Sequence, residues 1–187
     1  MIEIEVKLLI KDMDDLIDKL TGNGFNVSER IHMTDTYFDS ADNRIRDNGE
    51  ALRVREVKDL NTGEDTTAIT FKGKRLDSVL KTRRELETSV GSAEVCMEIF
   101  KALGLQPVKP WVTKTRTEYT RDNMTACVDQ VEGLGNYFEL EIVIPEDGSR
   151  EEAKEKIGSM LSMLGYSIDE AIKDSYLSLL RRESDVD

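Results

Sequence analysis

The sequence predicts an α+β domain in which about eight mostly antiparallel strands form a closed barrel or a strongly curled sheet, with helices on its apolar side. Three observations lead to this prediction. Several segments alternate apolar and charged residues with a period of two, which is typical of half-buried strands. Three other segments repeat apolar residues at helical spacing and end at glycine. A strand carrying two alternate Glu residues precedes each of these helices, so the strand–helix unit forms a weak internal repeat.

The first strand–helix unit begins at the second residue. Residues 2–9 alternate strictly, with aliphatic side chains at even positions and charged side chains at Glu3, Glu5 and Lys7. Asp12 follows and is placed to cap a helix. The apolar positions of that helix repeat at i, i+3, i+4 and i+7: Met13, Leu16, Ile17 and Leu20. Gly22 lies where the helix should end.

The other two units follow the same pattern. Charged residues alternate within residues 80–90 at Arg83, Glu85 and Glu87, and Ser92 then caps a helix that ends at Gly104. Glu139 and Glu141 alternate with apolar residues later in the chain. Ser149 opens the third helix, which ends at Gly165.

The remaining segments complete the predicted fold. Five further strands are expected over residues 25–38, 51–58, 66–72, 108–121 and 124–131. Hairpin-like connections are expected at 61–65, 73–75 and 121–123. Ser167 is placed to cap a last helix over 168–181, and the acidic end 183–187 predicts a disordered tail. We therefore expect a single domain over residues 1–182.

Composition excludes several functional classes. The 187 residues include 38 Asp and Glu and 26 Lys and Arg, which gives a net charge of −12. Such a charge should repel a nucleic-acid backbone. No apolar run is long enough for a bilayer, and no signal peptide opens the chain. Isolated Cys96 and Cys127 indicate reduced, buried thiols, so we expect a cytoplasmic protein with neither a nucleic-acid nor a membrane partner. A single His32 excludes a zinc site built on several imidazoles.

The charged faces of the predicted strands must point either to solvent or into the interior of a closed sheet. They carry seven acids and seven bases: Glu3, Glu5, Lys7, Arg53, Arg55, Lys72, Arg83, Glu85, Glu87, Lys114, Arg116, Asp129, Glu139 and Glu141. The simpler interpretation is a solvated sheet face. The alternative is a sheet that closes with its charged face inward, because the helices already occupy the outside. Like charges inside such a space need a ligand or ion of opposite sign.

The chemistry of these side chains indicates a type of ligand. Carboxylates at alternate positions point the same way, so those of neighbouring strands can converge on a hard cation such as Mg²⁺ or Mn²⁺. Lys and Arg in the same space can hold an anion of several charges. A metal and cations together are what phosphoryl transfer requires.

Several sequence blocks resemble those of a known family, the CYTH superfamily of triphosphate tunnel metalloenzymes. The blocks occur in the family's order and begin with Glu3-x-Glu5-x-Lys7, Asp35-Thr36-Tyr37-Phe38-Asp39, Ala51-Leu52-Arg53-Val54-Arg55, Thr70-Phe71-Lys72-Gly73 and Arg83-x-Glu85-x-Glu87. The later ones are Lys114-x-Arg116, Val128-Asp129-x-Val131-x-Gly133-Leu134-Gly135, Phe138-Glu139-x-Glu141 and Ser175-Tyr176-x-x-Leu179-Leu180. Together they cover nearly the whole chain and are most similar to the class IV adenylyl cyclase (CyaB-type) branch.

The resemblance implies an eight-stranded antiparallel tunnel that holds a triphosphate with basic side chains and Mg²⁺ or Mn²⁺ with acidic ones. The residues that it implies as metal ligands are Glu3, Glu5, Glu85, Glu87, Asp129, Glu139 and Glu141. Those that it implies as triphosphate ligands are Lys7, Arg53, Arg55, Lys72, Arg83, Lys114 and Arg116. A general base is not implied by the sequence.

Members of the family catalyse two reactions, and both stay open for this chain. The resemblance favours class IV adenylyl cyclase activity, in which ATP gives cyclic AMP and pyrophosphate. The alternative is hydrolysis of inorganic, thiamine or nucleoside triphosphate, and a further alternative is a polyphosphate-binding module without turnover. A homodimer is possible in each case, and Met160, Met163, Leu164 and Leu179 are expected to be buried against the sheet or a second subunit.

Three further pairs of residues have two interpretations each. Asp35 and Asp39 can bind either a metal or the backbone of a turn. Tyr37 and Phe38 can contact the organic part of a substrate, although aromatic residues on a central strand usually pack in a core. Arg44 and Arg46 lie in a segment that either closes over the tunnel mouth or is a solvated loop.

Overall fold

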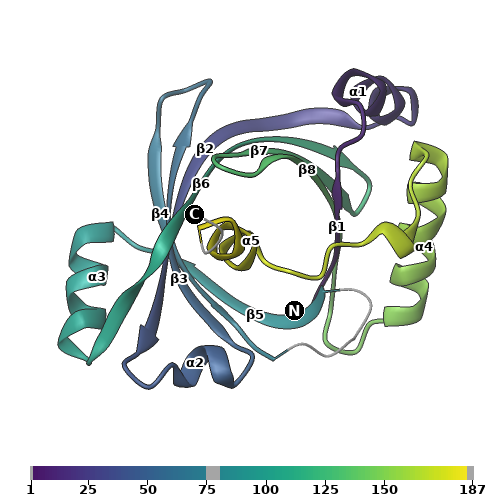
Figure 1. Ribbon diagram of the computed structural model, residues 1–187. Helices are drawn as coiled ribbons and strands as arrows, with labels where there is room; N and C mark the ends of the chain where they lie inside the picture. The colour runs from purple at the N-terminus through teal and green to yellow at the C-terminus, as the bar shows by residue number, and fades with distance from the viewer. Residues whose placement is uncertain (1, 75–80, 185–187) are drawn as a thin grey trace.

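A computed structural model describes residues 2–74 and 81–184. Within these residues the strands form a closed antiparallel barrel in the order β1-β5-β4-β3-β2-β6-β7-β8 (Figure 1). Their bounds are β1 (Ile2–Leu9), β2 (Asn26–Ser40), β3 (Ala51–Asp59), β4 (Asp65–Lys72), β5 (Lys81–Ser89), β6 (Leu105–Arg121), β7 (Met124–Val131) and β8 (Gly135–Ile144). The barrel closes where β1 pairs with both β5 and β8. The predicted α+β barrel is therefore confirmed.

Five α-helices accompany the barrel in the described residues: α1 (Met13–Gly22), α2 (Arg44–Asp47), α3 (Ala93–Ala102), α4 (Arg150–Leu164) and α5 (Tyr176–Ser184). Of these, α1, α3 and α4 begin at the capping residues predicted from the sequence. The side chain of Asp12 accepts a hydrogen bond from the Asp15 amide, 3.0 Å away, and Ser92 and Ser149 cap α3 and α4 in the same way. Gly165 adopts a left-handed conformation with φ 83° and ends α4.

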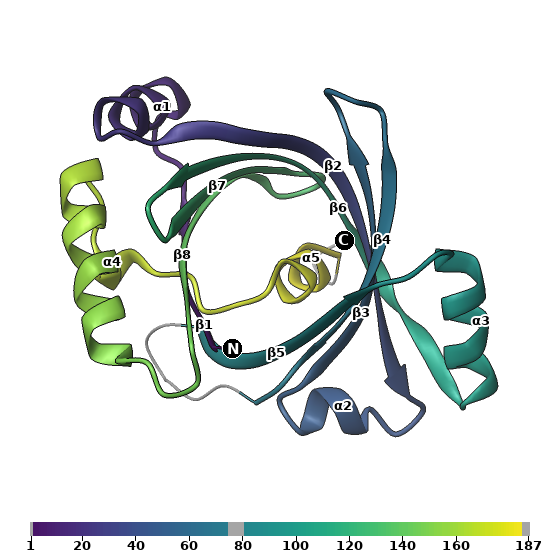
Figure 2. The same cartoon turned by 180° about the vertical axis from the view of Figure 1, so that it is seen from behind.

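Helices α1 and α4 cover the outer face of β1, β7 and β8 (Figures 1 and 2). The apolar even positions of β1 meet Leu16 and Leu20 of α1, and Ile157 and Leu161 of α4, in one buried core. Each such aliphatic side chain stabilises the fold by about 1.5–3 kcal/mol when it is fully buried. Met160 and Leu164 belong to this core as predicted, whereas Met163 is 52% exposed because it lies on the outer side of α4. Leu179, which belongs to α5, is only partly buried and packs in a different cluster.

Helix α3 covers a separate part of the barrel. Phe38 and Val54 pack beneath it with Ala93, and the Phe38 and Phe100 rings meet edge to face at 5.2 Å. The helices that cover the sheet thus lie outside it, and the charged side chains of the alternating strands face the interior. This arrangement confirms the inward interpretation of the charged faces and shows that the solvated-face interpretation is wrong.

The prediction of one continuous helix over 168–181 is wrong. Ser167 caps only the short 3₁₀ helix η1 (Ile168–Glu170), and the backbone becomes extended at Ala171. The Ile172 amide then donates a hydrogen bond to the Lys7 carbonyl of β1, 2.7 Å away. This tertiary contact replaces the helical bond, and α5 starts only at Tyr176. It continues through Ser184, and the rest of the expected tail, 185–187, lies outside the described residues.

Two smaller expectations concern the thiols and the membrane. Cys96 and Cys127 are both buried and free of disulfides, as predicted. Among the described residues, no helix has the length and apolar character needed to cross a membrane.

Candidate active site

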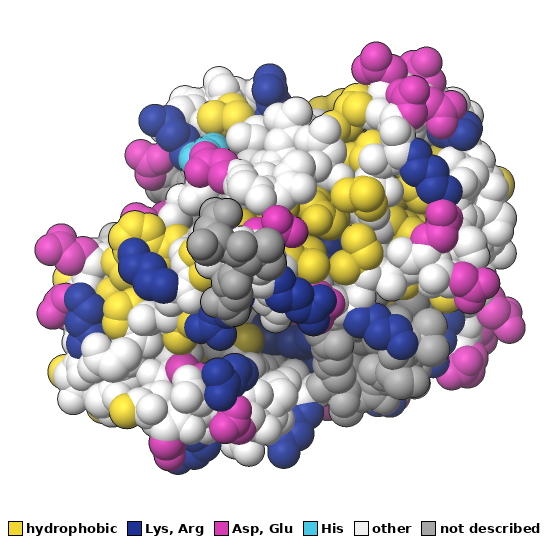
Figure 3. Space-filling model, viewed as in Figure 1, with side chains coloured by type: hydrophobic (Ala, Val, Ile, Leu, Met, Phe, Trp, Pro, Cys, Tyr) yellow, Lys and Arg dark blue, Asp and Glu magenta, His cyan; other side chains and the backbone are white. Residues whose placement is uncertain are grey.

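The barrel encloses a cavity of about 980 Å³ that is lined mainly by charged side chains. Every site residue predicted from the sequence lines it except Asp129, which is fully buried in its wall. Lys and Arg side chains gather around a hollow near the middle of the face shown in Figure 3. The strand register produces this arrangement, because residues directly opposite each other on neighbouring strands point the same way.

One part of the wall holds three carboxylates close together. Glu5 of β1 lies opposite Glu141 of β8, and Glu3 lies two residues before Glu5 on the same face of β1. Carboxylate oxygens of Glu3, Glu5 and Glu141 all lie within 4.8 Å of one another. Burial, with the neighbouring carboxylates, raises the pKa of Glu3 to about 8 against the opposing charge of Lys72. Burial and Glu5 raise the pKa of Glu141 to about 7.

These three glutamates fit a hard divalent cation. Three carboxylate groups from adjacent strands supply the oxygen ligands that Mg²⁺ and Mn²⁺ prefer. The raised pKa values of Glu3 and Glu141 reflect burial and repulsion by neighbouring carboxylates, and a cation between the three groups would offset both penalties.

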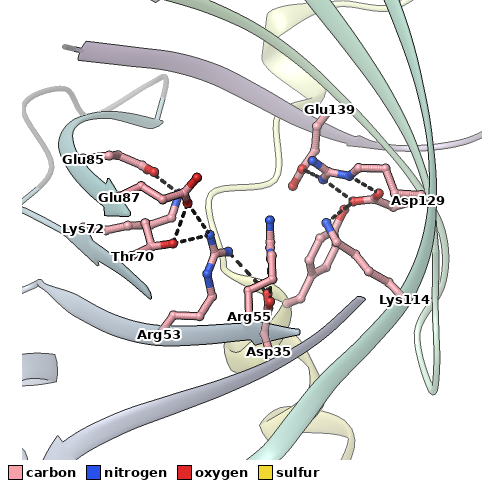
Figure 4. Close-up of polar contacts among 12 residues, drawn as sticks. Asp35, Arg53, Arg55, Thr70, Lys72, Glu85, Glu87, Lys114, Asp129 and Glu139 are labelled. Carbon is pink, nitrogen blue, oxygen red and sulfur yellow. Dashed lines mark hydrogen bonds and ion pairs between the residues drawn. The ribbon is translucent and has the colours of Figure 1, made fainter. Parts of the chain in front are cut away.

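A second group of carboxylates, Asp129 and Glu139, forms ion pairs with Lys and Arg side chains of the cavity (Figure 4). Asp129 Oδ1 accepts from Arg116 Nε at 2.6 Å, and its Oδ2 accepts from Arg116 Nη2 and Lys114 Nζ, both at 2.7 Å. Glu139 binds Arg116 and lies 3.7 Å from Lys7 Nζ. Burial alone would raise the pKa of Asp129, but Arg116 and Lys114 lower it below its ordinary value. Asp129 and Glu139 thus anchor cations and do not join the three-glutamate cluster.

Asp35 anchors the arginines of β3 in a similar way. Arg55 donates to both of its oxygens, at 2.6 and 2.8 Å, and Arg53 Nη1 lies 3.3 Å from Oδ2. Although burial opposes it, the charges of Arg55 and Arg53 lower the pKa of Asp35. Arg53 Nη2 also donates to Thr70 Oγ1 at 3.0 Å, and Thr70 donates to Glu87 Oε2 at 2.6 Å (Figure 4). Among the described side chains, Arg53 Nε is a buried polar atom with no hydrogen-bond partner.

The remaining predicted residues line the cavity beside β5. Lys72 pairs with Glu85 and lies 3.8 Å from Glu3 Oε1. Arg83 lies opposite Glu3 in the register of β1 and β5. The structure therefore brings Glu85 and Glu87 to basic neighbours, Lys72 and Arg53, and leaves Glu3, Glu5 and Glu141 as the cluster with metal-ligand spacing.

Three residues that shape this site are not predicted from the sequence. The sequence pattern offers Asp35 for a metal or a turn, whereas in the structure it binds two arginines. Thr70 and Tyr176 fall within quoted sequence blocks, but nothing in their residue types marked them as partners of Arg53 and Asp129. The pairing of a buried acid with inward bases on the next strand is the signal that would have identified Asp35.

Contacts outside the charged centre show the roles of Asp39 and of the neighbouring aromatic residues. Asp39 accepts hydrogen bonds from the backbone amides of Ser40, Ile45 and Arg46, at 2.8, 2.9 and 3.1 Å. This fixes α2 at the rim of the cavity and confirms the turn-binding interpretation of Asp39. Tyr37 lines the cavity, whereas Phe38 packs mainly in the core under α3. His32 lies 3.3 Å from Thr115 Oγ1 and does not line the cavity.

Comparisons with known proteins agree with this geometry. The CYTH domain family model matches residues 1–176. A protein of Methanocaldococcus jannaschii named "Putative adenylate cyclase" is 34% identical over 179 residues, which cover 96% of this chain and 98% of that relative.

Solved structures also match over nearly the full chain. A Pyrococcus horikoshii protein is 30% identical with a TM-score of 0.85, covering 97% of this chain and 99% of its own. A Hippeastrum protein described as a "putative adenylyl cyclase" with "a dominant triphosphatase activity" has a TM-score of 0.66 at 16% identity, covering 96% and 95%. At that identity the second match shows the fold alone.

Proposed function

The chain belongs to the CYTH domain family, and we propose that it is a divalent-metal-dependent enzyme acting on a triphosphate held inside the barrel. One observation carries this proposal. A cluster of three glutamates with metal-ligand spacing lies in the same cavity as a set of buried, fixed Lys and Arg side chains. This is the combination that phosphoryl transfer requires.

Glu3, Glu5 and Glu141 are the residues that would hold Mg²⁺ or Mn²⁺. When bound, the ion would supply positive charge that neutralises the negative charge developing on the phosphate group. Glu85, Glu87, Asp129 and Glu139, which the resemblance also implies as ligands, have basic partners in the structure. We assign to these four the role of holding the basic side chains in place.

The proposed triphosphate ligands are Lys7, Arg53, Arg55, Lys72, Arg83, Lys114 and Arg116. Asp35 and Asp129 hold the guanidinium groups of Arg55 and Arg116 through paired hydrogen bonds, so these cations need little rearrangement when an anion binds. The buried Nε of Arg53 supports the same assignment, because an unsatisfied buried donor is costly and a phosphate oxygen would accept from it.

The most specific form of the proposal is adenylyl cyclase activity, supported by the name of the 34% identical relative. In that reaction the ribose 3′-hydroxyl of ATP attacks the α-phosphorus, pyrophosphate leaves, and the hydroxyl proton passes to a base that we do not assign. The second candidate is hydrolysis of a triphosphate, favoured by the activity described for the Hippeastrum protein of the same fold. Both reactions use the same metal and cations and differ in which phosphorus meets an aligned nucleophile.

A product assay tests the proposal. The chain is incubated with ATP, inorganic triphosphate or thiamine triphosphate in Mg²⁺ or Mn²⁺, with a Glu3→Gln variant as the control. Cyclic AMP with pyrophosphate supports the cyclase, whereas orthophosphate supports the triphosphatase. Stabilisation without product, which is about 2.7 kcal/mol at 100 times the dissociation constant, would indicate a binding module. No product and no metal-dependent stabilisation would overturn the proposal.

A further inference from the structure

Tyr176 lies at the point where the C-terminal helix meets the cations of the cavity. Both views show α5 within the ring of strands (Figures 1 and 2), and Tyr176 is its first residue. The ring of Tyr176 is buried and lines the cavity. Its centroid lies 3.7 Å from Lys7 Nζ and 5.1 Å from Lys114 Nζ.

The hydroxyl of Tyr176 has a separate contact. It donates to Asp129 Oδ2 at 2.9 Å, the same oxygen that accepts from Lys114 and Arg116. This oxygen therefore has three donors, and the hydroxyl restricts where the carboxylate can move. The Tyr137 ring meets the Tyr176 ring edge to face at 5.2 Å and fixes its plane.

A ring in this position has a specific effect on the two lysines. Aromatic faces attract ammonium groups, and the attraction is strongest where water is excluded. Lys7 and Lys114 are each only 2% exposed, so the ring replaces part of their lost hydration. Because both ammonium groups face one ring, their separation and direction are set by α5.

We propose that Tyr176 is a positioning residue for the polyphosphate group, acting through Lys7 and Lys114 by its ring and through Asp129 by its hydroxyl. The inference rests on the proposed function, since these lysines are its proposed triphosphate ligands. The CYTH match ends at residue 176, so the rest of α5 lies beyond the matched region. Leu177, Leu179 and Leu180 pack that helix beside Val112 and Val131, which holds the ring in place.

Two substitutions separate the ring from the hydroxyl. Tyr176→Phe keeps the ring and removes the bond to Asp129, whereas Tyr176→Leu removes both. Tyr166→Leu is the matched control. Tyr166 is also buried and also has a lysine over its ring, Lys11 at 5.1 Å, but it packs in the outer core under α4.

Calorimetric titration with inorganic triphosphate in Mg²⁺, and with Mg²⁺ alone, gives the readout. We expect Tyr176→Leu to weaken triphosphate binding by about tenfold or more and Tyr176→Phe by about threefold at most. Tyr166→Leu should leave this affinity unchanged, and Mg²⁺ alone should bind equally well in every variant. A structural role without positioning would instead change both affinities in proportion to lost stability, and that result would overturn the inference.

A spectroscopic signature tests the geometry without a ligand. The ring should shift the Lys7 side-chain methylene protons upfield in the unmodified chain and in Tyr176→Phe, and this shift should be absent in Tyr176→Leu. If Tyr176→Leu does not fold, the comparison of the unmodified chain with Tyr176→Phe still applies, and the absence of an upfield shift in both overturns the inference. A chain that binds Mg²⁺ but no triphosphate would overturn the proposed function. Triphosphate binding that is equal in the unmodified chain and Tyr176→Leu would overturn the inference alone.

Discussion

The cavity wall contains two groups of carboxylates with opposite electrostatic states, one on β7 and β8 and the other on β1 and β8. Asp129 and Glu139 bind Arg116, with Lys114 and Lys7 nearby, and the pKa of Asp129 is lowered. Glu3 and Glu141 lie beside Glu5, and burial with like charges raises their pKa values to about 8 and about 7. Burial favours a raised pKa in both groups, so the charges of the neighbouring side chains determine the difference.

This contrast separates acids whose pKa is lowered by the protein's own cations from acids whose pKa is raised by burial and neighbouring carboxylates. A carboxylate with two cationic partners balances charge inside the folded protein. Removing it leaves those partners buried without a counter-charge. A carboxylate among other carboxylates destabilises the fold at neutral pH unless a cation binds. The predictions below test this distinction, from the largest expected effect to the smallest.

Asp129→Asn should give the largest loss of stability. The amide keeps the shape of the side chain but leaves Lys114 and Arg116 buried without their counter-charge. Removing one partner of a buried ion pair typically costs about 3–5 kcal/mol. Urea denaturation of the metal-free chain at pH 7.5 measures the change. A loss below about 1 kcal/mol would show that Asp129 does not balance these cations.

Glu141→Gln is the matched substitution in the three-glutamate cluster, and here we expect no loss of stability. It removes one of three mutually repelling charges, so the metal-free chain should be as stable as before or more stable. Turnover in Mg²⁺ should fall about 100-fold or more, because a metal ligand is lost. Denaturation and the product assay are run on the same preparation. Full activity in Glu141→Gln would remove this residue from the metal site.

The pH dependence of stability should differ with and without metal. The pKa of Glu3 rises from its ordinary 4.5 to about 8 in the folded chain, so the folded state binds more protons than the unfolded state between these values. Its stabilising contribution is complete below about pH 4.5 and is lost as pH rises through 8, and Glu141 acts likewise up to about 7. Melting temperature with chelator should therefore fall from pH 5 to 8, on the order of 5 °C.

Saturating Mg²⁺ should remove most of that decline, because a bound cation favours the ionised carboxylates. The stabilisation by Mg²⁺ should accordingly be larger at pH 8 than at pH 6. Glu3→Gln supplies the control, since its melting temperature with chelator should depend less on pH over this range. The same slope in Glu3→Gln and in the unmodified chain would contradict the assignment.

Thr70→Val should have the smallest effect. Thr70 joins Arg53 to Glu87, and valine keeps its shape while removing both hydrogen bonds. We expect a loss of about 1 kcal/mol of stability and a weakening of triphosphate binding by about threefold. Thr115→Val is the control, because Thr115 contacts His32 and does not line the cavity. Equal changes in triphosphate affinity for both variants would show that Thr70 does not orient Arg53.

The parts of the fold that depend on local chemistry could be predicted. Strict alternation in β1 predicts which side chains share a face, and the caps at Asp12, Ser92 and Ser149 follow from the hydrogen bonds that short polar side chains make with a helix start. The break after η1 could not be predicted. It depends on a bond between Ile172 and Lys7, and these two residues lie at opposite ends of the sequence.

The sequence also could not predict which carboxylates pair with bases and which lie together, because this depends on contacts between residues far apart in the sequence. Alternation gives the face of a strand but neither its neighbour nor its register. Asp129 is opposite Arg116, whereas Glu141 is opposite Glu5, and both facts depend on the strand order in the barrel. Seven acids and seven bases are therefore predicted as one metal-binding and one triphosphate-binding set. The structure divides the acids further, into those paired with bases and those in the three-glutamate cluster.

The pairing of β1 with β8 also determines when the cavity comes into existence during folding. Glu141 follows Glu3 and Glu5 by a long stretch of sequence, so the chain must close a very long loop before the three can meet. A nascent chain that has not completed β8 lacks the full three-carboxylate set, and the ion cannot act on this set as an early template. Metal affinity should therefore develop only after β8 has paired with β1.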